Sequence, residues 1–259
     1  MPLRALVLCF TLAIALAQPA LAFDPAAMSD AERDAFRAEI RAYLLENPEV
    51  LLEAINELDA RKAAAQIVND SAMVAQNKQA IFDDGRSWVG GNAAGDVTLV
   101  EFVDYRCSYC KRAHAEVADL VQSDGNIRYV LKEFPILGED SLLASRFAIA
   151  VRAVGGADVY WQMHDSLMNF RGDITPDTLD RVAVGLGLDP QVVRTAMDGP
   201  AVMAEIEANH ILAGLLDISG TPTFVLQVAG GTKPETMLRG YLPQAEMQAV
   251  VAEIRTQGG

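Results

Sequence analysis

Two cysteines separated by two residues, Cys107-Ser108-Tyr109-Cys110, constrain most strongly what this chain of 259 residues can form. The run before them, 97–103, predicts a strand, and the run after them, 111–121, predicts a helix. Thiols three residues apart in a first helical turn can reach each other and cycle between dithiol and disulfide. The unpaired N–H groups and the positive dipole end of the helix favour a thiolate at Cys107, which is therefore the predicted nucleophile. A structural disulfide and half of a zinc site are the alternative interpretations.

The first 22 residues have the pattern of a secretory signal peptide. Arg4 precedes an apolar run over 5–17, and Ala20-Leu21-Ala22 forms a small-residue cleavage site. The run is too short to cross a bilayer. Cys9 would leave with it, so the exported chain would keep only the spaced cysteine pair in a compartment where disulfides persist.

The net charge and the short loop between the two cysteines exclude some classes of function. The net charge of −14 becomes about −15 once Arg4 is removed, which argues against nucleic acid and anionic membrane surfaces as partners. A disulfide between Cys107 and Cys110 would close so short a loop that the chain-entropy model gives it only about 2 kcal/mol of stabilisation. We therefore interpret the pair as redox-active rather than structural.

The residues before the cysteines predict two helices and an assembly surface. Ser29 or Asp30 can cap the first helix, and Asn47-Pro48 restarts the second, which runs to about residue 82. An apolar stripe at near-heptad spacing must be buried on the rest of the chain or on copies of itself, and we expect self-association. Residues 23–85 are thus a predicted helical oligomerisation segment, and the Gly-, Asn- and Asp-rich stretch 86–96 is a predicted linker. The stripe consists of Leu51, Ile55, Leu58, Ala65 and Ala72.

The remainder, 97–259, alternates strands and helices. A strand, the cysteine helix and a second strand over 127–134 predict a parallel pair with a right-handed crossover. Two later strands separated by a Gly-Gly turn predict a hairpin, and a last helix starts at Pro243. This order predicts an α/β fold with helices on both faces of the sheet. Between the halves lie helical runs over 141–154, 157–170, 176–186, 190–197 and 201–216.

This arrangement resembles the thioredoxin fold in its DsbA-like form, in which a helical domain, here at about 138–205, is inserted between the two halves. The resemblance rests on the C-x-x-C motif, on Gly220-Thr221-Pro222-Thr223-Phe224 before a strand, and on the all-helical insert. It implies a thiol-disulfide oxidoreductase without a cofactor, in which Pro222 is a cis-proline facing the cysteines. The residues that would contact an extended substrate segment are Ser108, Tyr109, Thr221 and Pro222.

A second resemblance covers the segment Arg41 to Leu52, which is similar to the N-terminal part of the suppressor-of-copper-sensitivity type C (ScsC-like) proteins. It implies a periplasmic homo-oligomer, with a trimer as the form found in that group. The partners it implies are exported proteins with thiols or disulfides and a membrane protein that resets the cysteine pair.

The direction of the reaction is left open by the sequence. Ser108-Tyr109 lacks the histidine of strongly oxidising DsbA relatives, and Thr221 before the proline resembles isomerases. These features favour a disulfide isomerase or reductase over the alternatives, a DsbA-like dithiol oxidase and a non-enzymatic copper(I) carrier.

Several polar residues are candidate helpers. The resemblance places a buried acid at Glu101, which shares a strand face with Leu99 and Val103 and could carry protons for Cys110; an exposed edge position is the alternative. Lys132 is a weaker candidate partner of that acid, and Asp104 is expected to shape the turn into the helix.

Two histidines are considered as metal ligands. His114 lies near the helix face of the cysteines, and His164 lies in a segment rich in Met and aromatic residues. We expect a polar helix residue and a core residue instead, and no metal site.

Overall fold

The structure is a computed structural model that describes residues 27–231 and 235–258. The predicted signal peptide, residues 1–22, lies outside the described residues. The described residues divide into two units between Arg61 and Lys62, a boundary that lies within one long helix.

The larger unit is built on a five-stranded sheet with the order β1-β3-β2-β4-β5. The central strands β2 and β3 are parallel, whereas β1 pairs antiparallel with β3 and the β4-β5 hairpin pairs antiparallel with β2. The expected parallel pair and hairpin are confirmed. The strands are β1 (Trp88–Gly91), β2 (Val97–Val103), β3 (Ile127–Glu133), β4 (Thr223–Val228) and β5 (Thr236–Arg239).

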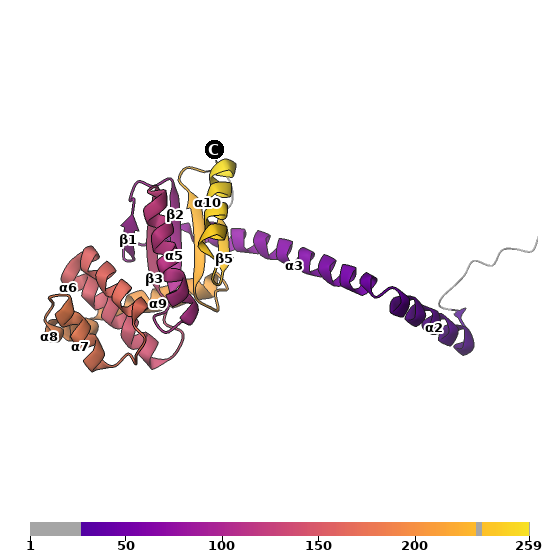
Figure 1. Ribbon diagram of the computed structural model, residues 1–259, viewed down its shortest axis with the longest axis horizontal. Helices are drawn as coiled ribbons and strands as arrows, with labels where there is room; N and C mark the ends of the chain where they lie inside the picture. Colours follow the sequence, from indigo (N-terminus) through magenta and orange to yellow (C-terminus); the bar gives the residue numbers. More distant parts are fainter. Residues whose placement is uncertain (1–26, 232–234, 259) are drawn as a thin grey trace, which may run out of the picture. The chain divides into compact units, whose positions relative to one another are not determined.

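Helices cover both faces of this sheet (Figure 1). On one face α5 (Ser108–Asp124), α6 (Glu139–Asn169) and α10 (Gln244–Gly258) contribute to the main hydrophobic cluster. On the other face a second cluster joins the sheet to α4 (Lys78–Phe82), α9 (Pro200–Leu215) and the end of α3 (Glu49–Gln76). The expected layered α/β architecture is confirmed.

Strand β2 is buried along its whole length, so its residues alternate between the two clusters. Leu99 and Val103 belong to the α5 side, while Val100 and Phe102 belong to the opposite side. By the same alternation, Glu101 is directed toward the α5 side, and its side chain is 2% exposed. The exposed-edge alternative for this acid is excluded.

The predicted helical insert packs α6 against α7 (Pro176–Gly185) and α8 (Pro190–Met197) (Figure 1). The two predicted runs, 141–154 and 157–170, are both helical and are confirmed. They share the label α6 but are separated by Gly156, whose φ of 84° is not helical. A side chain is strained at that φ, so glycine is favoured there. Thr175 and Asp189 cap α7 and α8, and a proline follows each cap.

The smaller unit contains α2 (Asp30–Glu46) and the first part of α3. Ser29 and Glu32 form a reciprocal capping box at the start of α2. The apolar stripe is exposed here, with Leu51, Ile55 and Leu58 each about half exposed.

The division between the units differs from the predicted boundary at residues 85 and 86. Val74, Ile81 and Phe82 are buried in the second cluster together with sheet residues such as Val100 and Val225. Residues 62–85 therefore belong to the larger unit. The near-heptad spacing of apolar residues is the same in both parts of the helical segment. It therefore does not predict which of these residues pack on the sheet and which remain exposed.

The predicted linker 86–96 contains a strand. Residues 88–91 form β1, in register with Leu131 to Arg128 of β3. Trp88 is 7% exposed and donates from Nε1 to the carbonyl of Ala157, at 2.9 Å. The glycines around it are typical of a linker, but burial of the indole holds the strand in place.

The new boundary predicts where substitutions will destabilise the larger unit. The sequence analysis placed Phe82 in the helical segment 23–85, outside the larger unit. Phe82→Ala should nevertheless lower the free energy of unfolding of the larger unit by about 4 kcal/mol, because a buried aromatic side chain is lost. Leu52→Ala, at a side chain 62% exposed, is the control and should change it by less than about 0.5 kcal/mol. Urea unfolding followed by tryptophan fluorescence measures this unit alone, since both tryptophans lie in it. Equal midpoints for the two variants would contradict the boundary.

Candidate active site

Cys107 is the N-cap residue of α5, immediately after the loop that follows β2. Asp104, fully buried in this loop, fixes its path. One carboxylate oxygen accepts from the N–H of Arg106 and the hydroxyl of Ser141, and the other accepts from the N–H groups of Ile136 and Leu137. The expectation that Asp104 shapes this turn is confirmed, and it also fastens the loop to the start of the insert.

The sulfur of Cys107 lies between the first turn of α5 and the loop before β4. The backbone N–H of Cys110 donates to the Sγ of Cys107 at 3.4 Å. The Cys107 thiol in turn donates to the carbonyl oxygen of Thr221, which lies 3.1 Å from Sγ. The Thr221-Pro222 peptide is cis, and Pro222 is buried. The chain thus brings together Cys107 and a loop 114 residues later.

The surroundings of Cys107 favour its thiolate. Hydrogen bonds lower the pKa of its thiol to about 5. The largest effect comes from the Cys110 thiol, followed by the side chain of Thr221 and the backbone of Cys110 and Tyr109. Burial opposes this effect. At neutral pH the sulfur is therefore an anion, which is the reactive form in thiol-disulfide exchange.

Cys110 differs from Cys107 although it lies one turn away. Its side chain is fully buried, and both cysteines are thiols in this structure. Burial raises the pKa of Cys110 well above its usual range, and the charges of Glu101 and Cys107 add to the shift. Cys110 can attack only if its proton is removed.

Glu101 is the acid that faces both thiols. Burial raises the pKa of its carboxyl to about 7, the nearby Cys107 adds to this, and a hydrogen bond from the Tyr129 hydroxyl opposes it. A carboxyl that titrates near neutral pH suits proton transfer.

Lys132 is not a partner of Glu101, which corrects that candidate. Glu101 is paired with Leu131 in the β2-β3 register, so Lys132 is directed to the other face of the sheet. There its ammonium binds Asp84 at 2.7 Å and Ser87 at 3.1 Å.

A second buried acid, Glu133, was missed by the sequence analysis. Its carboxylate accepts from the hydroxyls of Tyr105 at 2.9 Å, Tyr160 at 2.6 Å and Ser145 at 2.8 Å. Burial raises its pKa to about 7. The sequence signal that could have indicated Glu133 is the position of an acid at the end of an apolar strand. The hydrogen bonds from Tyr105, Tyr160 and Ser145 join β3 to the active-site loop and to α6.

The histidines do not join the cysteines. His114 is buried, and its Nε2 lies 2.9 Å from Asp165. His164 contacts the hydroxyl of Tyr105 through Nδ1, and burial lowers its pKa well below the usual range, so it is neutral. Within 27–231 and 235–258 no group of three or more His, Cys, Asp and Glu residues is arranged to hold a metal ion.

The surface beside Cys107 carries two tyrosines and an arginine. Ser108 and Tyr109 are exposed, and the ring of Tyr109 stacks at 6.5 Å on that of Tyr241. The Arg112 guanidinium lies 4.3 Å from the centroid of the Tyr241 ring, and the Tyr241 hydroxyl donates to the carboxylate of Glu116. Tyr241 was not predicted because it lies far along the chain, beside the β5 end that contacts Pro222.

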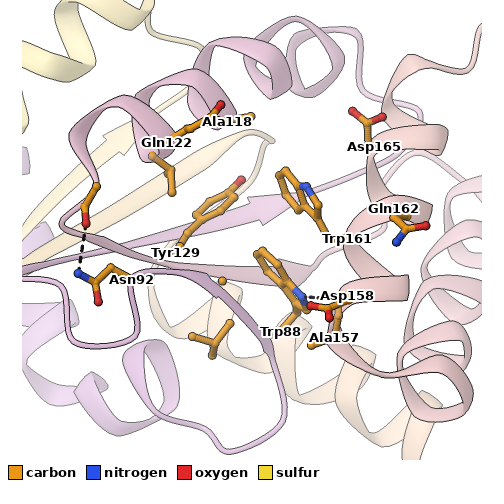
Figure 2. Close-up of a pocket in the computed structure, with 15 residues that line it drawn as sticks. Trp88, Asn92, Ala118, Gln122, Tyr129, Ala157, Asp158, Trp161, Gln162 and Asp165 are labelled. Carbon is orange, nitrogen blue, oxygen red and sulfur yellow. Dashed lines mark hydrogen bonds between the residues drawn. The ribbon is translucent and has the colours of Figure 1, made fainter.

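A cavity of about 950 Å³ lies apart from the sulfurs, between β1, α5 and α6 (Figure 2). Trp88 and Trp161 stack in it with ring centroids 5.1 Å apart, and Tyr129 is placed beside them. Its lining does not include either cysteine or the Thr221-Pro222 loop.

Comparison with known proteins places this geometry in a family. Residues 98–251 match the DSBA-like thioredoxin domain. The chain belongs to the DSBA-like thioredoxin domain family. Residues 32–65 match a second family, the copper resistance protein ScsC N-terminal domain, so both resemblances stated from the sequence are confirmed.

Solved structures agree with the family. A thioredoxin-like oxidoreductase from Silicibacter pomeroyi DSS-3 is 39% identical, with a TM-score of 0.63, over 70% of this chain and 98% of that one. BcfH from Salmonella enterica Typhimurium is 26% identical, with a TM-score of 0.71, over 86% of this chain and 96% of that one.

Among curated relatives, a Na(+)/H(+) antiporter NhaA 1 from Salinispora arenicola is 34% identical over 142 residues, which are 55% of this chain and 22% of the antiporter. The chain thus spans only about a quarter of the length of the first curated relatives it matches. No helix in the described part of the chain is both long and apolar enough to cross a membrane.

The low pKa of Cys107 is directly measurable. In the reduced protein the absorbance of the thiolate should rise with a midpoint near pH 5, because the thiol loses its proton above that pH. Cys110→Ala should move the midpoint upward, since it removes the largest contribution, and Cys107→Ser should abolish the transition. A midpoint near 8.5, the value of an ordinary thiol, would contradict the assignment.

Proposed function

We propose that the protein is a periplasmic thiol-disulfide oxidoreductase that acts as a disulfide isomerase or reductase on exported proteins. The observation that carries the proposal is the position of the Cys107 sulfur, between the α5 N-terminus and the Thr221-Pro222 loop. The membership in the DSBA-like family supports it.

The proposed reaction uses the two cysteines in sequence. The Cys107 thiolate attacks a substrate disulfide, forms a mixed disulfide and releases one substrate sulfur as a thiolate. Glu101 removes the proton of Cys110, which then attacks Cys107 and releases the second substrate sulfur. The cysteine pair is oxidised to a disulfide and the substrate disulfide is reduced. In isomerisation a different thiolate of the same substrate attacks the substrate sulfur of the mixed disulfide instead. A new substrate disulfide forms, and Cys107 leaves as a thiolate without net oxidation.

The substrate is proposed to lie along the Thr221 backbone. A segment extended beside this residue can pair with it as a short added strand, which positions a substrate sulfur at Cys107. Ser108, Tyr109 and Pro222 would complete the contact surface. Tyr109 is 59% exposed, so its ring is available to an apolar substrate side chain.

The preference for isomerase or reductase over oxidase rests on Ser108-Tyr109 between the cysteines and on Thr221 before the proline. A membrane redox protein is the proposed partner that returns the pair to the dithiol. The proposed periplasmic location rests on the signal-like first 22 residues and on the ScsC N-terminal match.

Refolding assays test the proposed direction. The reduced protein should reactivate a small secreted enzyme whose disulfides have been scrambled, and Cys107→Ser should reduce the rate to background because the nucleophile is lost. Cys110→Ser should accumulate mixed disulfides visible by mass spectrometry. Oxidation of the reduced substrate without reactivation of the scrambled form would favour the oxidase and contradict the isomerase.

Assembly is a further part of the proposal, since several active sites around one substrate favour reshuffling. Leu51→Lys with Ile55→Lys should convert an oligomer, proposed to be a trimer, to a monomer in light scattering of residues 23–259, because charges would face the apolar stripe. Glu53→Lys, an exposed position between them, is the matched control. A wild-type monomer would refute the assembly while leaving the chemistry untouched.

A further inference from the structure

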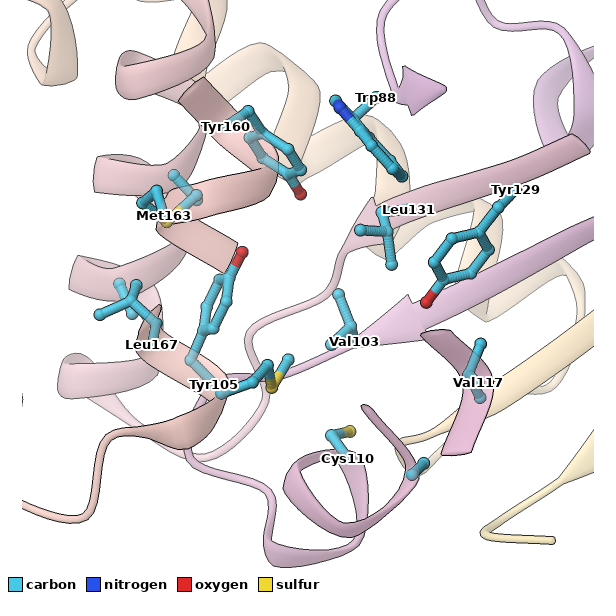
Figure 3. Close-up of a cluster of buried hydrophobic side chains, with 14 of the residues drawn as sticks. Trp88, Val103, Tyr105, Cys110, Val117, Tyr129, Leu131, Tyr160, Met163 and Leu167 are labelled. Carbon is cyan, nitrogen blue, oxygen red and sulfur yellow. The ribbon is translucent and has the colours of Figure 1, made fainter. Parts of the chain in front are cut away.

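Tyr129 on β3 is the hydrogen-bond donor to the buried acid of the thiol site. Its hydroxyl donates to Oε2 of Glu101, and each side chain is 2% exposed. Burial raises the pKa of Tyr129 well above its usual range, so the hydroxyl keeps its proton and stays a donor. Figure 3 shows this hydroxyl directed into the main hydrophobic cluster, which also contains Cys110.

Few groups in the described residues can influence Glu101. Tyr129 interacts with it from β3, and Cys107 and Cys110 interact with it from the start of α5. On the β4 side its register partner is Phe224, which carries no charge. Within the described residues the Glu101 carboxyl therefore accepts a side-chain hydrogen bond from Tyr129 and interacts electrostatically with the two sulfurs.

The ring of Tyr129 is held by two indoles. Trp88 meets it edge to face at 5.9 Å and Trp161 at 6.3 Å, with interplanar angles of 88° and 79°. These rings come from β1 and α6, and the stacked indoles line the cavity of Figure 2. The contacts restrict the ring and hence the direction of its hydroxyl.

We propose that Tyr129 is the positioning residue for Glu101, holding one carboxylate oxygen so that the other is free to take the proton of Cys110. The inference rests on the proposed function and adds a residue to it. In the step concerned, a sulfur–sulfur bond joins Cys107 to the substrate. The Glu101 carboxylate takes the Cys110 proton, the new thiolate attacks Cys107, and the substrate sulfur leaves with the bonding electron pair. Glu101, now a neutral acid, returns its proton to solvent.

The hydrogen bond also sets the pH range of this step. Glu101 acts as a base only when ionised, and the Tyr129 hydroxyl stabilises that form against burial. Because a hydrogen bond to a charged group is lost, Tyr129→Phe should raise the pKa of Glu101 by about 1 to 2 units. The resolving step would then require a higher pH.

A chromogenic aromatic disulfide separates the two steps. Mixed in limiting amount with the reduced full-length protein, it releases one coloured thiolate when Cys107 attacks and a second when Cys110 resolves the mixed disulfide. The wild-type second phase should have a midpoint at or below pH 7, because burial still raises the pKa of Glu101 but the Cys107 charge is absent in the mixed disulfide. In Tyr129→Phe the first phase should be unchanged, and the second should slow at least about tenfold at low pH and recover at high pH.

Tyr160→Phe is the matched control. Tyr160 is equally buried and also donates to a buried acid, Glu133, which has a raised pKa but does not act on the sulfurs. Its loss should leave the pH profile of the second phase unchanged. A pH shift of the same size in both variants would show a general packing defect and overturn the inference.

The Glu101→Gln background provides the decisive comparison. If Tyr129 acts through Glu101, adding Tyr129→Phe to Glu101→Gln should slow the second phase by less than about twofold. An undiminished additional loss would overturn the inference, as would an unshifted profile in the single variant. Absence of the first phase in the wild type would instead refute the proposed function, so the two failures are distinguishable.

Discussion

The contact between the Cys107 sulfur and two segments far apart in the chain is the constraint on which the site depends. The α5 N-terminus supplies N–H groups, and the Thr221-Pro222 loop closes the other side. Their meeting requires β2 and β4 to be neighbours, which the register from Val97–Val228 to Phe102–Thr223 provides. Asp104 completes the arrangement, because its four accepted hydrogen bonds fix the short loop between β2 and α5.

Two buried carboxyls on the same face of the sheet show how surroundings divide roles between similar groups. Glu133 accepts hydrogen bonds from three hydroxyls and connects the insert to β3. Glu101 accepts from Tyr129 and faces the thiols. Burial raises both pKa values to about 7, but only Glu101 is coupled to sulfur. The first arrangement is suited to holding elements together and the second to moving a proton.

The features predictable from sequence were those encoded locally. The cysteine spacing, the capping residues of α7 and α8, and the Thr221-Pro222 turn are each contained in a few residues, and each lies where it was expected. Features that depend on register were not predictable. Lys132 was a candidate partner of Glu101, yet a one-residue step along β3 directs it to the opposite face.

Burial was also hard to predict from composition. The glycine-rich stretch that contains β1 has the composition of a linker, and only the tertiary contacts of Trp88 hold it as a strand. Ile81 and Phe82 continue the apolar pattern of α3 but pack on the sheet. Tyr129 was not predicted for a related reason. Its hydrogen bond to Glu101 joins the neighbouring strands β3 and β2, and it cannot be inferred without knowing how these strands pair.

The central claim is that Cys107 and Cys110 form a working exchange pair whose dithiol form is stabilised by the Cys107 thiolate. Its most direct test is the reduction potential of the pair, measured by equilibration with glutathione at pH 7. A stabilised thiolate predicts an oxidising value above about −230 mV, in the range of catalytic disulfides. A value below about −300 mV, typical of structural disulfides, would contradict the account.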